Sequence, residues 1–252
     1  MDKFREFDIL KYQTQKGDVY LENLDIKDCK IIGKPCENIY IYKCSFHNAV
    51  FENYFQYCDV SMEESQFKNC EFHGKQGEQC ESFEMRECTF ESVLFNNQFK
   101  DSLIAVENCH FRHCTFRGML GSGDFELCDS QLEDSQIENI NMGPQGESAL
   151  VTECEFVNCN FKNIDISREI EFDELDIREG KINSLNCIKS DIQLCHFYKV
   201  CLENVYLESN FLDNDMDSVI FRNVTLKGTM RNKSDIEENV FIHCDTSGFT
   251  YL

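Results

Sequence analysis

A five-residue period in the apolar residues constrains the fold of this chain more than any other feature of its sequence. Leu21, Ile26 and Ile31 follow one another at this spacing, and so do Val151 and Phe156. A second period of 20 to 24 residues relates such groups to one another. The spacing does not match the 3.6-residue period of an amphipathic helix. The pattern instead predicts a solenoid in which each coil stacks on the one before.

The two periods place apolar residues in three columns that run along the solenoid. Column A comprises Leu21, Ile41, Met62, Met85, Val106, Leu127, Val151, Phe172, Ile192, Met216 and Ile236. Column B, five residues later in each coil, comprises Ile26, Phe46, Phe67, Phe90, Phe111, Leu132, Phe156, Ile177, Phe197, Phe221 and Phe241. Column C, five residues later again, comprises Ile31, Phe51, Phe72, Phe95, Phe116, Ile137, Phe161, Ile182, Leu202 and Leu226. We therefore expect an all-β solenoid of about eleven coils with these columns in its interior.

Differences in coil length fall on one side of each coil. The columns are always five residues apart, whereas the distance from column C to the next column A varies from 10 to 14 residues. Longer insertions are expected near 73–82, 142–148 and 208–213. A square coil with three regular sides and one loop-bearing side produces this pattern.

The predicted solenoid, roughly residues 19–252, resembles the pentapeptide-repeat family. Members of that family carry a large central residue, Leu or Phe, and a small residue two positions before it. Matching pairs in this chain are Ala49/Phe51, Ser65/Phe67, Cys70/Phe72, Ser130/Leu132, Ser135/Ile137 and Cys159/Phe161. The resemblance implies a right-handed quadrilateral β-helix.

Half of the 16 cysteines stand two residues before a phenylalanine, and no two have the C-x-x-C spacing of zinc ribbons and thioredoxin-like motifs. Residues i and i+2 of a strand face the same side, so each such cysteine is expected to point into the apolar interior with its phenylalanine. We predict that these thiols are buried, reduced and free of metal. They are Cys44, Cys70, Cys88, Cys109, Cys114, Cys154, Cys159 and Cys195.

The two ends of the solenoid differ. Residues 1–18 are predicted to form an N-terminal cap, because Phe4, Phe7 and Leu10 share one face at three-residue spacing. At the other end the sequence stops inside the last coil, and exposed strand edges with apolar residues favour association. We expect a homodimer through the C-terminal coil. Its candidate interface comprises Phe241, Phe249, Tyr251 and Leu252.

Acidic residues outnumber basic ones by 46 to 24, which gives a net charge of −22. In the predicted register the acids gather beside column A, where the bases are Lys43 and Arg86. Such a stripe attracts a basic protein surface and repels nucleic acid and anionic membranes. It equally serves as a solvated face that keeps a β-rod soluble, and the sequence leaves both readings open. The candidate partner-binding stripe comprises Glu63, Glu64, Glu84, Glu87, Glu107, Glu126, Asp129, Glu153, Glu171, Asp173, Glu174, Asp191, Asp215 and Asp217.

Motifs that could carry chemistry do not fit the predicted register. Cys109 and Cys114 point inward whereas His110 points outward, so they are not expected to share a metal ion. The segment beginning at Asp213 starts like a calcium-binding loop, but Ser218 stands where that loop requires glycine. The sequence contains no nucleotide-binding loop and no nucleophile elbow. We expect neither a cofactor nor enzymatic activity.

The resemblance and the charge together suggest a function. One branch of the pentapeptide-repeat family consists of acidic, rod-shaped dimers that imitate duplex DNA and protect DNA gyrase and topoisomerase IV from inhibitors. The resemblance therefore implies a non-enzymatic protein-interaction surface, with DNA mimicry toward a type II topoisomerase as the specific hypothesis. The alternative is a generic interaction or structural scaffold with another basic or protein partner. The charged start of the chain and the lack of a long apolar run predict a cytoplasmic protein.

Overall fold

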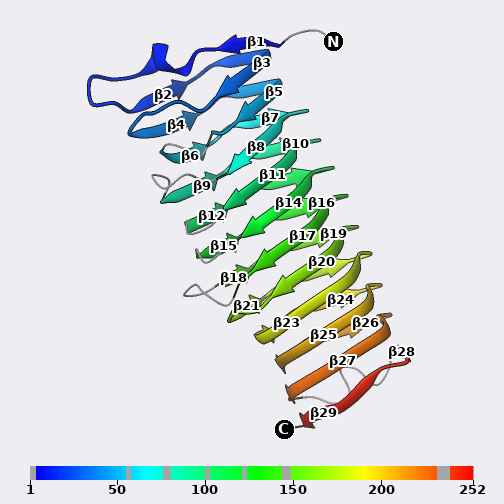
Figure 1. Ribbon diagram of the computed structural model, residues 1–252. Helices are drawn as coiled ribbons and strands as arrows, with labels where there is room; N and C mark the ends of the chain where they lie inside the picture. Colours follow the sequence, from blue (N-terminus) through cyan, green and yellow to red (C-terminus); the bar gives the residue numbers. More distant parts are fainter. Residues whose placement is uncertain are drawn as a thin grey trace.

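The computed structural model describes residues 4–54, 58–75, 81–99, 103–120, 124–143, 149–231 and 239–251. Its strands form one continuous sheet that winds into a rod of about ten stacked coils (Figure 1). Strands of adjacent coils pair in parallel, and the 3-10 helix η1 (Ile9–Tyr12) precedes the first coil. The all-β solenoid predicted from the repeat is confirmed, with about ten coils where about eleven were expected.

Each coil consists of short strands joined by corners, and in the last coils some strands continue around a corner. The N-terminal half contains β1 (Arg5–Phe7), β2 (Val19–Glu22), β3 (Asp25–Ile32), β4 (Asn38–Tyr42), β5 (Ser45–Glu52), β6 (Asp59–Glu63), β7 (Gln66–Lys68), β8 (Glu71–Lys75), β9 (Ser82–Arg86), β10 (Thr89–Glu91), β11 (Leu94–Phe99), β12 (Leu103–Glu107), β13 (His110–Arg112) and β14 (Thr115–Leu120). The C-terminal half contains β15 (Phe125–Cys128), β16 (Gln131–Glu133), β17 (Gln136–Met142), β18 (Ala149–Thr152), β19 (Glu155–Val157), β20 (Asn160–Ile166), β21 (Ile170–Asp173), β22 (Asp176–Arg178), β23 (Lys181–Gln193), β24 (His196–Tyr198), β25 (Cys201–Leu212), β26 (Asp215–Asp217), β27 (Ile220–Met230), β28 (Val240–Ile242) and β29 (Asp245–Tyr251).

Most corners turn through a residue in the left-handed region, two positions after a central apolar residue. Asn48, Asn69 and Asn158 each occupy this position with φ of 52°. Asparagine tolerates this conformation better than most residues, because its short side chain can hydrogen-bond locally. The amide groups also link neighbouring coils, as where Asn163 Nδ2 donates to Asn139 Oδ1 at 3.0 Å. Asparagine at the corners thus stabilises both the turn and the stack.

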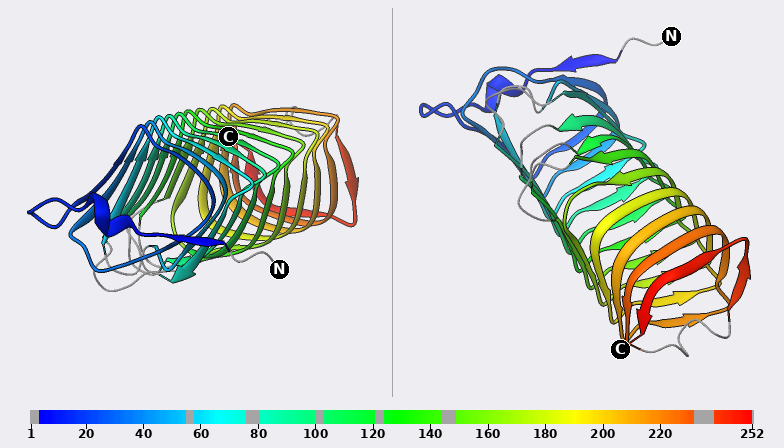
Figure 2. Two further views of the ribbon diagram at one scale, coloured as in Figure 1. Left: turned by 90° about the horizontal axis from the view of Figure 1, so that it is seen from above. Right: turned by 60° about the horizontal axis from the view of Figure 1, so that its bottom comes forward.

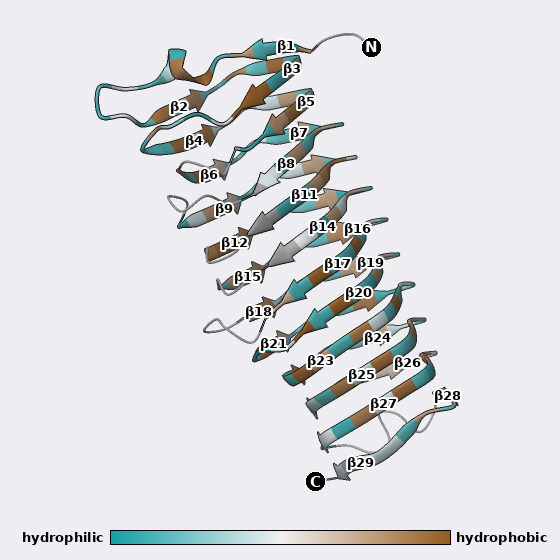
Figure 3. Ribbon diagram, in the orientation of Figure 1, coloured by the Kyte–Doolittle hydropathy of each residue, from teal (hydrophilic) through white to brown (hydrophobic). Residues whose placement is uncertain are grey.

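The interior is a ladder of phenylalanine rings. In column B the ring centroids of Phe46 and Phe67 are 5.1 Å apart, and those of Phe67 and Phe90 are 4.9 Å apart. Column C continues alongside, with Phe51 and Phe72 stacked at 4.3 Å. Apolar and polar residues alternate along the strands (Figure 3), and seen along the rod the coils superpose on one another (Figure 2). The stack buries the predicted columns because parallel pairing in register places like residues over like.

The eight cysteines that precede a phenylalanine are all buried, as predicted, and form no disulfide in the structure. Their reduced, metal-free state stays a prediction. Removal from water raises the pKa of Cys154 and of Cys195 to about 12, so these thiols are protonated at neutral pH. Serine takes the same inward position in some coils. There Ser130 Oγ accepts a hydrogen bond from the Cys109 backbone N–H at 3.0 Å, which satisfies both buried groups.

The predicted register is wrong in the last coils. Phe197 pairs with Met216, so Met216 belongs to column B and not to column A. Phe221 pairs with Leu202 and then with Phe241, which places both phenylalanines in column C and not in column B. Column A continues instead with Phe211 and Met230, Leu226 lies on the fourth side, and Ile236 is outside the described residues. Because the apolar period is five, a shift by one side leaves every such residue pointing inward.

This shift also removes one predicted insertion. Residues 208–213 include the end of β25, which pairs with β23 and β27, so no loop interrupts the chain there. From β17 onward the fourth side carries its own column of inward residues, comprising Met142, Ile166, Cys187, Leu207 and Leu226. The other two expected insertions fall largely on 76–80 and 144–148, outside the described residues. In the described coils from β17 to β27, the fourth side is therefore paired strand to strand like the other sides.

Residues 4–18 lie against the first coil. Strand β1 pairs with β3, so that Arg5 stands beside Cys29. Ile9 is fully buried, whereas Phe4 is 47% exposed, so the three-residue spacing of Phe4, Phe7 and Leu10 does not define one packed face. A capping role for residues 1–18 is a proposal supported by the β1–β3 pairing.

Candidate functional site

The candidate site is face A, defined as the outward side chains of the strands that carry column A together with the left-handed residue that follows each strand. Most of the predicted stripe lies there: Glu63, Glu64, Glu84, Glu87, Glu107, Glu126, Asp129, Glu153, Glu171, Asp173, Glu174 and Asp191. Asp215 and Asp217 do not, because β26 pairs with β24 and carries column B. These two acids lie on the next side of the rod, face B.

The acids of face A are most closely stacked at its corner. Asp129, Glu153 and Glu174 follow one another in successive coils with φ of 50°, 52° and 53°. The Asp129 carboxylate raises the pKa of Glu153 by charge repulsion, with smaller contributions from Glu174 and Asp173. A raised pKa at an exposed carboxyl indicates like-charge crowding. A cationic partner would relieve this repulsion.

Bases compensate the N-terminal part of face A. Lys43 Nζ lies 3.4 Å from a Glu64 oxygen. Arg86 lies 3.4 Å from Glu84 and 3.5 Å from Glu107. Exposed pairs of this kind contribute little to stability, but they cancel charge locally.

The C-terminal part of face A has no such compensation among the residues that the structure describes. No Lys, Arg or His nitrogen of the described chain lies within 4.0 Å of the carboxylates of Asp129, Glu153, Glu171, Asp173, Glu174 or Asp191. Neutral side chains hydrogen-bond some of them, as where Asn210 donates to Asp191 at 2.7 Å. Face A is therefore most negative between β15 and β23.

The bases of the neighbouring sides are engaged with acids across adjacent coils. On face B, Lys68 pairs with Glu91 at 2.8 Å. On the next side, face C, Lys30 pairs with Glu52 at 2.7 Å and Lys181 with Glu203 at 2.6 Å. These pairings leave faces B and C mixed in sign, whereas the charged side chains of face A between β15 and β23 are all acidic.

A groove of about 580 Å³ borders the uncompensated part of face A. It lies where β18, β21, β23 and β25 approach the corner between the fourth side and face A. Its charged lining comprises Glu169, Glu171, Lys189, Asp191 and Glu208. The sequence pattern did not identify Glu169 and Glu208, because they belong to the fourth side, whose register was uncertain before pairing was known. Four acids around one base make the groove a suitable site for a protruding cationic side chain.

At the C-terminal end of the rod, the last described strands pair with a neighbour on one side only. Strands β28 and β29 pair with β27 and lie at the end of the stack (Figure 2). Phe241 is half-buried and stacks on Phe221 at 4.6 Å, while Val240 is 53% exposed. Phe249 and Tyr251 belong to β29, but their side chains, like the whole of Leu252, lie outside the described part of the chain.

The structure places the Cys109–Cys114 motif on two sides of the sheet. Cys109 and Cys114 are buried, whereas His110 between them is partly exposed on the other side of the strand. The described ranges contain no group of three or more His, Cys, Asp or Glu side chains arranged to hold a metal ion. None of the helical segments in these ranges is long and apolar enough to cross a membrane.

No protein-family model matches the chain, and no curated protein matches it either. Solved structures do. The plasmid-mediated fluoroquinolone resistance protein QnrB1 is 14% identical, with a TM-score of 0.43 over 79% of this chain and 92% of that chain. HetL, a pentapeptide repeat protein involved in heterocyst differentiation regulation from Nostoc sp. strain PCC 7120, is 9% identical, with a TM-score of 0.37 over 90% and 89%. The tailspike protein gp49 from Acinetobacter baumannii bacteriophage Fri1, a capsular polysaccharide depolymerase, is 9% identical, with a TM-score of 0.50 over 91% and 57%.

Among these neighbours, QnrB1 and HetL are pentapeptide-repeat proteins, and this chain is a β-solenoid. The chain is consistent with a pentapeptide-repeat protein. At these identities the likeness concerns the fold, so the function of this solenoid has to be argued from its own faces.

Proposed function

We propose that the protein acts by binding, without catalysis, and that face A is the surface that recognises a basic protein partner. The observation that carries the proposal is the run of acids between β15 and β23 with no base within 4.0 Å in the described chain. A face needed only for solubility gains from interspersed charges of both signs, as on faces B and C. One-signed crowding, with the raised pKa of Glu153, favours a cationic partner.

The specific form of this proposal is imitation of duplex DNA toward a type II topoisomerase, DNA gyrase or topoisomerase IV. A rigid rod with negative charge along one face offers a DNA-binding surface the same sign of charge over an extended length. QnrB1, a fluoroquinolone resistance protein, shares the solenoid architecture. The proposal includes action in the cytoplasm, where such a partner is found.

Charge reversal on face A tests the proposal. We expect the triple change Glu171→Lys, Asp173→Lys and Glu174→Lys to weaken binding to gyrase by about 100-fold, because three attractive contacts become repulsive. Affinity of the unchanged protein should fall steeply with salt and should be lost in competition with duplex DNA. The measurements are surface binding at several salt concentrations and gyrase supercoiling with and without a quinolone.

A matched control uses face B. The change Glu179→Lys, Asp215→Lys and Asp217→Lys alters the net charge equally, and all three residues are exposed. It should reduce gyrase binding only slightly. If both triple variants lose affinity equally, face A is not the recognition surface. If the unchanged protein neither binds gyrase or topoisomerase IV nor competes with DNA, DNA mimicry is wrong and the scaffold with a different partner stands.

We also propose that the rod dimerises through its C-terminal end, because β28 and β29 pair on one side only within the described part of the chain. Sedimentation velocity at micromolar concentrations should show a dimer. The double change Phe249→Asp and Tyr251→Asp should yield a monomer, whereas Phe4→Asp with Tyr20→Asp at the other end should not. An unchanged protein that sediments as a monomer contradicts this proposal.

A further inference from the structure

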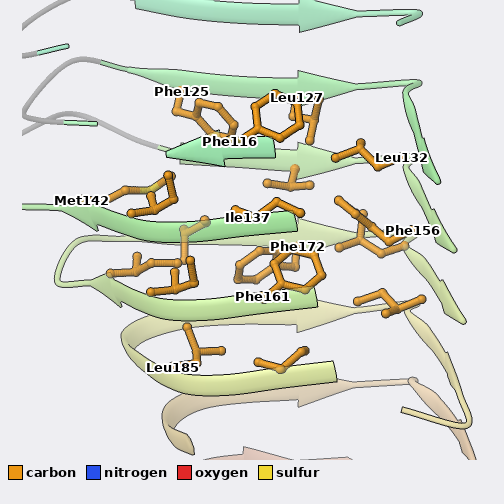
Figure 4. Close-up of a pocket in the computed structure, with 18 of the residues that line it drawn as sticks. Phe116, Phe125, Leu127, Leu132, Ile137, Met142, Phe156, Phe161, Phe172 and Leu185 are labelled. Carbon is orange, nitrogen blue, oxygen red and sulfur yellow. The ribbon is translucent and has the colours of Figure 1, made fainter. Parts of the chain in front are cut away.

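An apolar cavity of about 270 Å³ runs inside the rod, with linings that extend from Phe83 in β9 to Phe221 in β27. Figure 4 shows Phe116, Ile137 and Phe161, from β14, β17 and β20, lying one above another along it. Apart from Asn97, Arg117 and Gly118, the lining residues are aliphatic or aromatic. The cavity is thus long, narrow and almost free of polar groups.

The cavity runs beside the last rings of the phenylalanine ladder, Phe95, Phe111 and Phe116, and continues beyond them. The stacked rings of columns B and C are fully buried at Phe67 and Phe72, and stacking in column C continues to Phe95 and Phe116 at 4.9 Å. In the next coil Leu132 and Ile137 replace both phenylalanines. The coil keeps the same width, because five residues still separate the columns, so the smaller side chains leave space. Phe116, Ile137 and Phe161 are therefore only partly buried although they face inward.

One polar group faces this space from its N-terminal end. Asn97 in β11 is only 5% exposed and lines the cavity, and its Oδ1 has no hydrogen-bond partner among the residues that the structure describes. In register it lies between Gly74 and Gly118, which have no side chains to reach it. A buried acceptor without a donor is costly, and such groups in folded proteins usually meet a ligand or an ordered water.

The neighbouring cation is not available to a charged ligand. The exposed Arg117 side chain forms an ion pair with Glu138. The chain also carries a net charge of −22, which repels anions. A ligand head group beside Asn97 must therefore be neutral and must donate a hydrogen bond.

We propose that the cavity binds a single-chain aliphatic molecule that ends in a neutral hydroxyl group, with the hydroxyl donating to Asn97 Oδ1 and the chain extending toward Phe221. The cavity exceeds the engineered apolar cavity of about 150 Å³ that stays dry and binds benzene. Its elongated lining fits a linear chain. This ligand site is independent of the proposed partner binding, because face A points outward from the same coils.

The test uses the full chain, stripped of bound organic molecules and titrated with hexadecanol, methyl palmitate and palmitic acid against a fluorescent acyl probe. Hexadecanol should displace the probe saturably and raise the melting temperature. Methyl palmitate has no hydroxyl and should bind about 10-fold more weakly. Palmitic acid should bind better at a pH where its carboxyl is protonated. Mass spectrometry of the organic extract from freshly purified protein identifies any natural occupant.

Two variants make the test decisive. Asn97→Leu should bring hexadecanol and methyl palmitate to equal affinity, since the acceptor is gone. The pair Leu132→Phe and Ile137→Phe continues the ring ladder and should abolish displacement without lowering the melting temperature. The proposal is overturned if hexadecanol does not bind the unchanged protein, or if the filled variant binds it equally well. Gyrase binding by the filled variant shows whether face A is intact. Failure of the ligand proposal can therefore be told apart from failure of the proposed partner binding.

Discussion

Replacing Phe90 with alanine is expected to lower the free energy of unfolding by about 4–5 kcal/mol, the upper part of the range for buried phenylalanines. Its side chain is fully buried, and its ring lies 4.9 Å from Phe67, 4.7 Å from Phe111 and 5.3 Å from Phe95. Deleting the ring leaves a hole between rigid stacked neighbours. Urea unfolding followed by circular dichroism measures the loss. Because each coil contacts only its neighbours, the transition should also become less cooperative.

Phe156→Ala is the matched comparison within column B. Phe156 stacks between Leu132 and Ile177, makes one edge contact with Phe161 at 5.5 Å, and already lines the cavity. Its removal should cost nearer 3 kcal/mol, the lower part of the range. Equal losses for the two variants would contradict the distinction between a filled N-terminal half and a looser C-terminal half.

Gly118→Ala is expected to destabilise the rod by about 3 kcal/mol or more, because two penalties combine. Gly118 has φ of +142°, which L-residues rarely adopt, and an added Cβ would lie 1.7 Å from the Asn97 carbonyl oxygen. That oxygen belongs to the backbone of the coil before, so it cannot move aside without breaking the sheet. Register shifts between β14 and β17 at this glycine, which marks a corner where the coil changes path. Thermal unfolding measures the effect.

Gly143→Ala provides the control on the same side of the rod. An added Cβ at Gly143 meets nothing within 4 Å. This change should alter stability by less than about 1 kcal/mol, through the unfolded chain alone. If the two alanine variants have the same melting temperature, the close approach of the backbone at Gly118 is not the reason for glycine at that position.

Much of the fold could be predicted because one period governs it. Columns A, B and C were assigned correctly as far as Ile192, Phe197 and Leu202. Within each of these coils the columns are five residues apart, so one correctly placed residue fixes the register of the other two. The prediction failed where a coil shortens, as Phe211 follows Ile192 by 19 residues and not by the 20 or more assumed. When the apolar period is five, each side of the coil carries one inward apolar residue, so moving a residue to the next side preserves the pattern. Hydrophobicity alone therefore cannot tell a shift of one side from an insertion.

The candidate site was predictable in part for the same reason. Acids beside column A follow from the period, which located Asp129, Glu153 and Glu174 correctly. Which acids are neutralised by bases depends on ion pairs between adjacent coils, such as that of Arg86 with Glu107. These pairs can be assigned only once the pairing of the strands is known. The interior cavity was not predictable, because Leu132 and Ile137 satisfy the apolar pattern as well as phenylalanine does. The sequence pattern shows which residues are apolar, whereas the space left in the interior depends on the volumes of their side chains.

The stacking distance of the coils has a consequence for any comparison with DNA. The corner position of face A repeats about every 4.8 Å along the rod, and phosphates repeat about every 3.4 Å along one DNA strand. Acids occupy this corner in three successive coils, at Asp129, Glu153 and Glu174. Five coils and seven phosphates both span about 24 Å, so the two spacings come into step at intervals of about 24 Å. A position repeated in each of about ten coils would come into step with the phosphates at two points. The corner also holds Lys43 and Asn108, so the acids themselves follow this spacing only over shorter runs. A protein that contacts individual phosphates would find acids at the expected positions only at those points. A protein attracted by the overall negative potential would be attracted along the whole face.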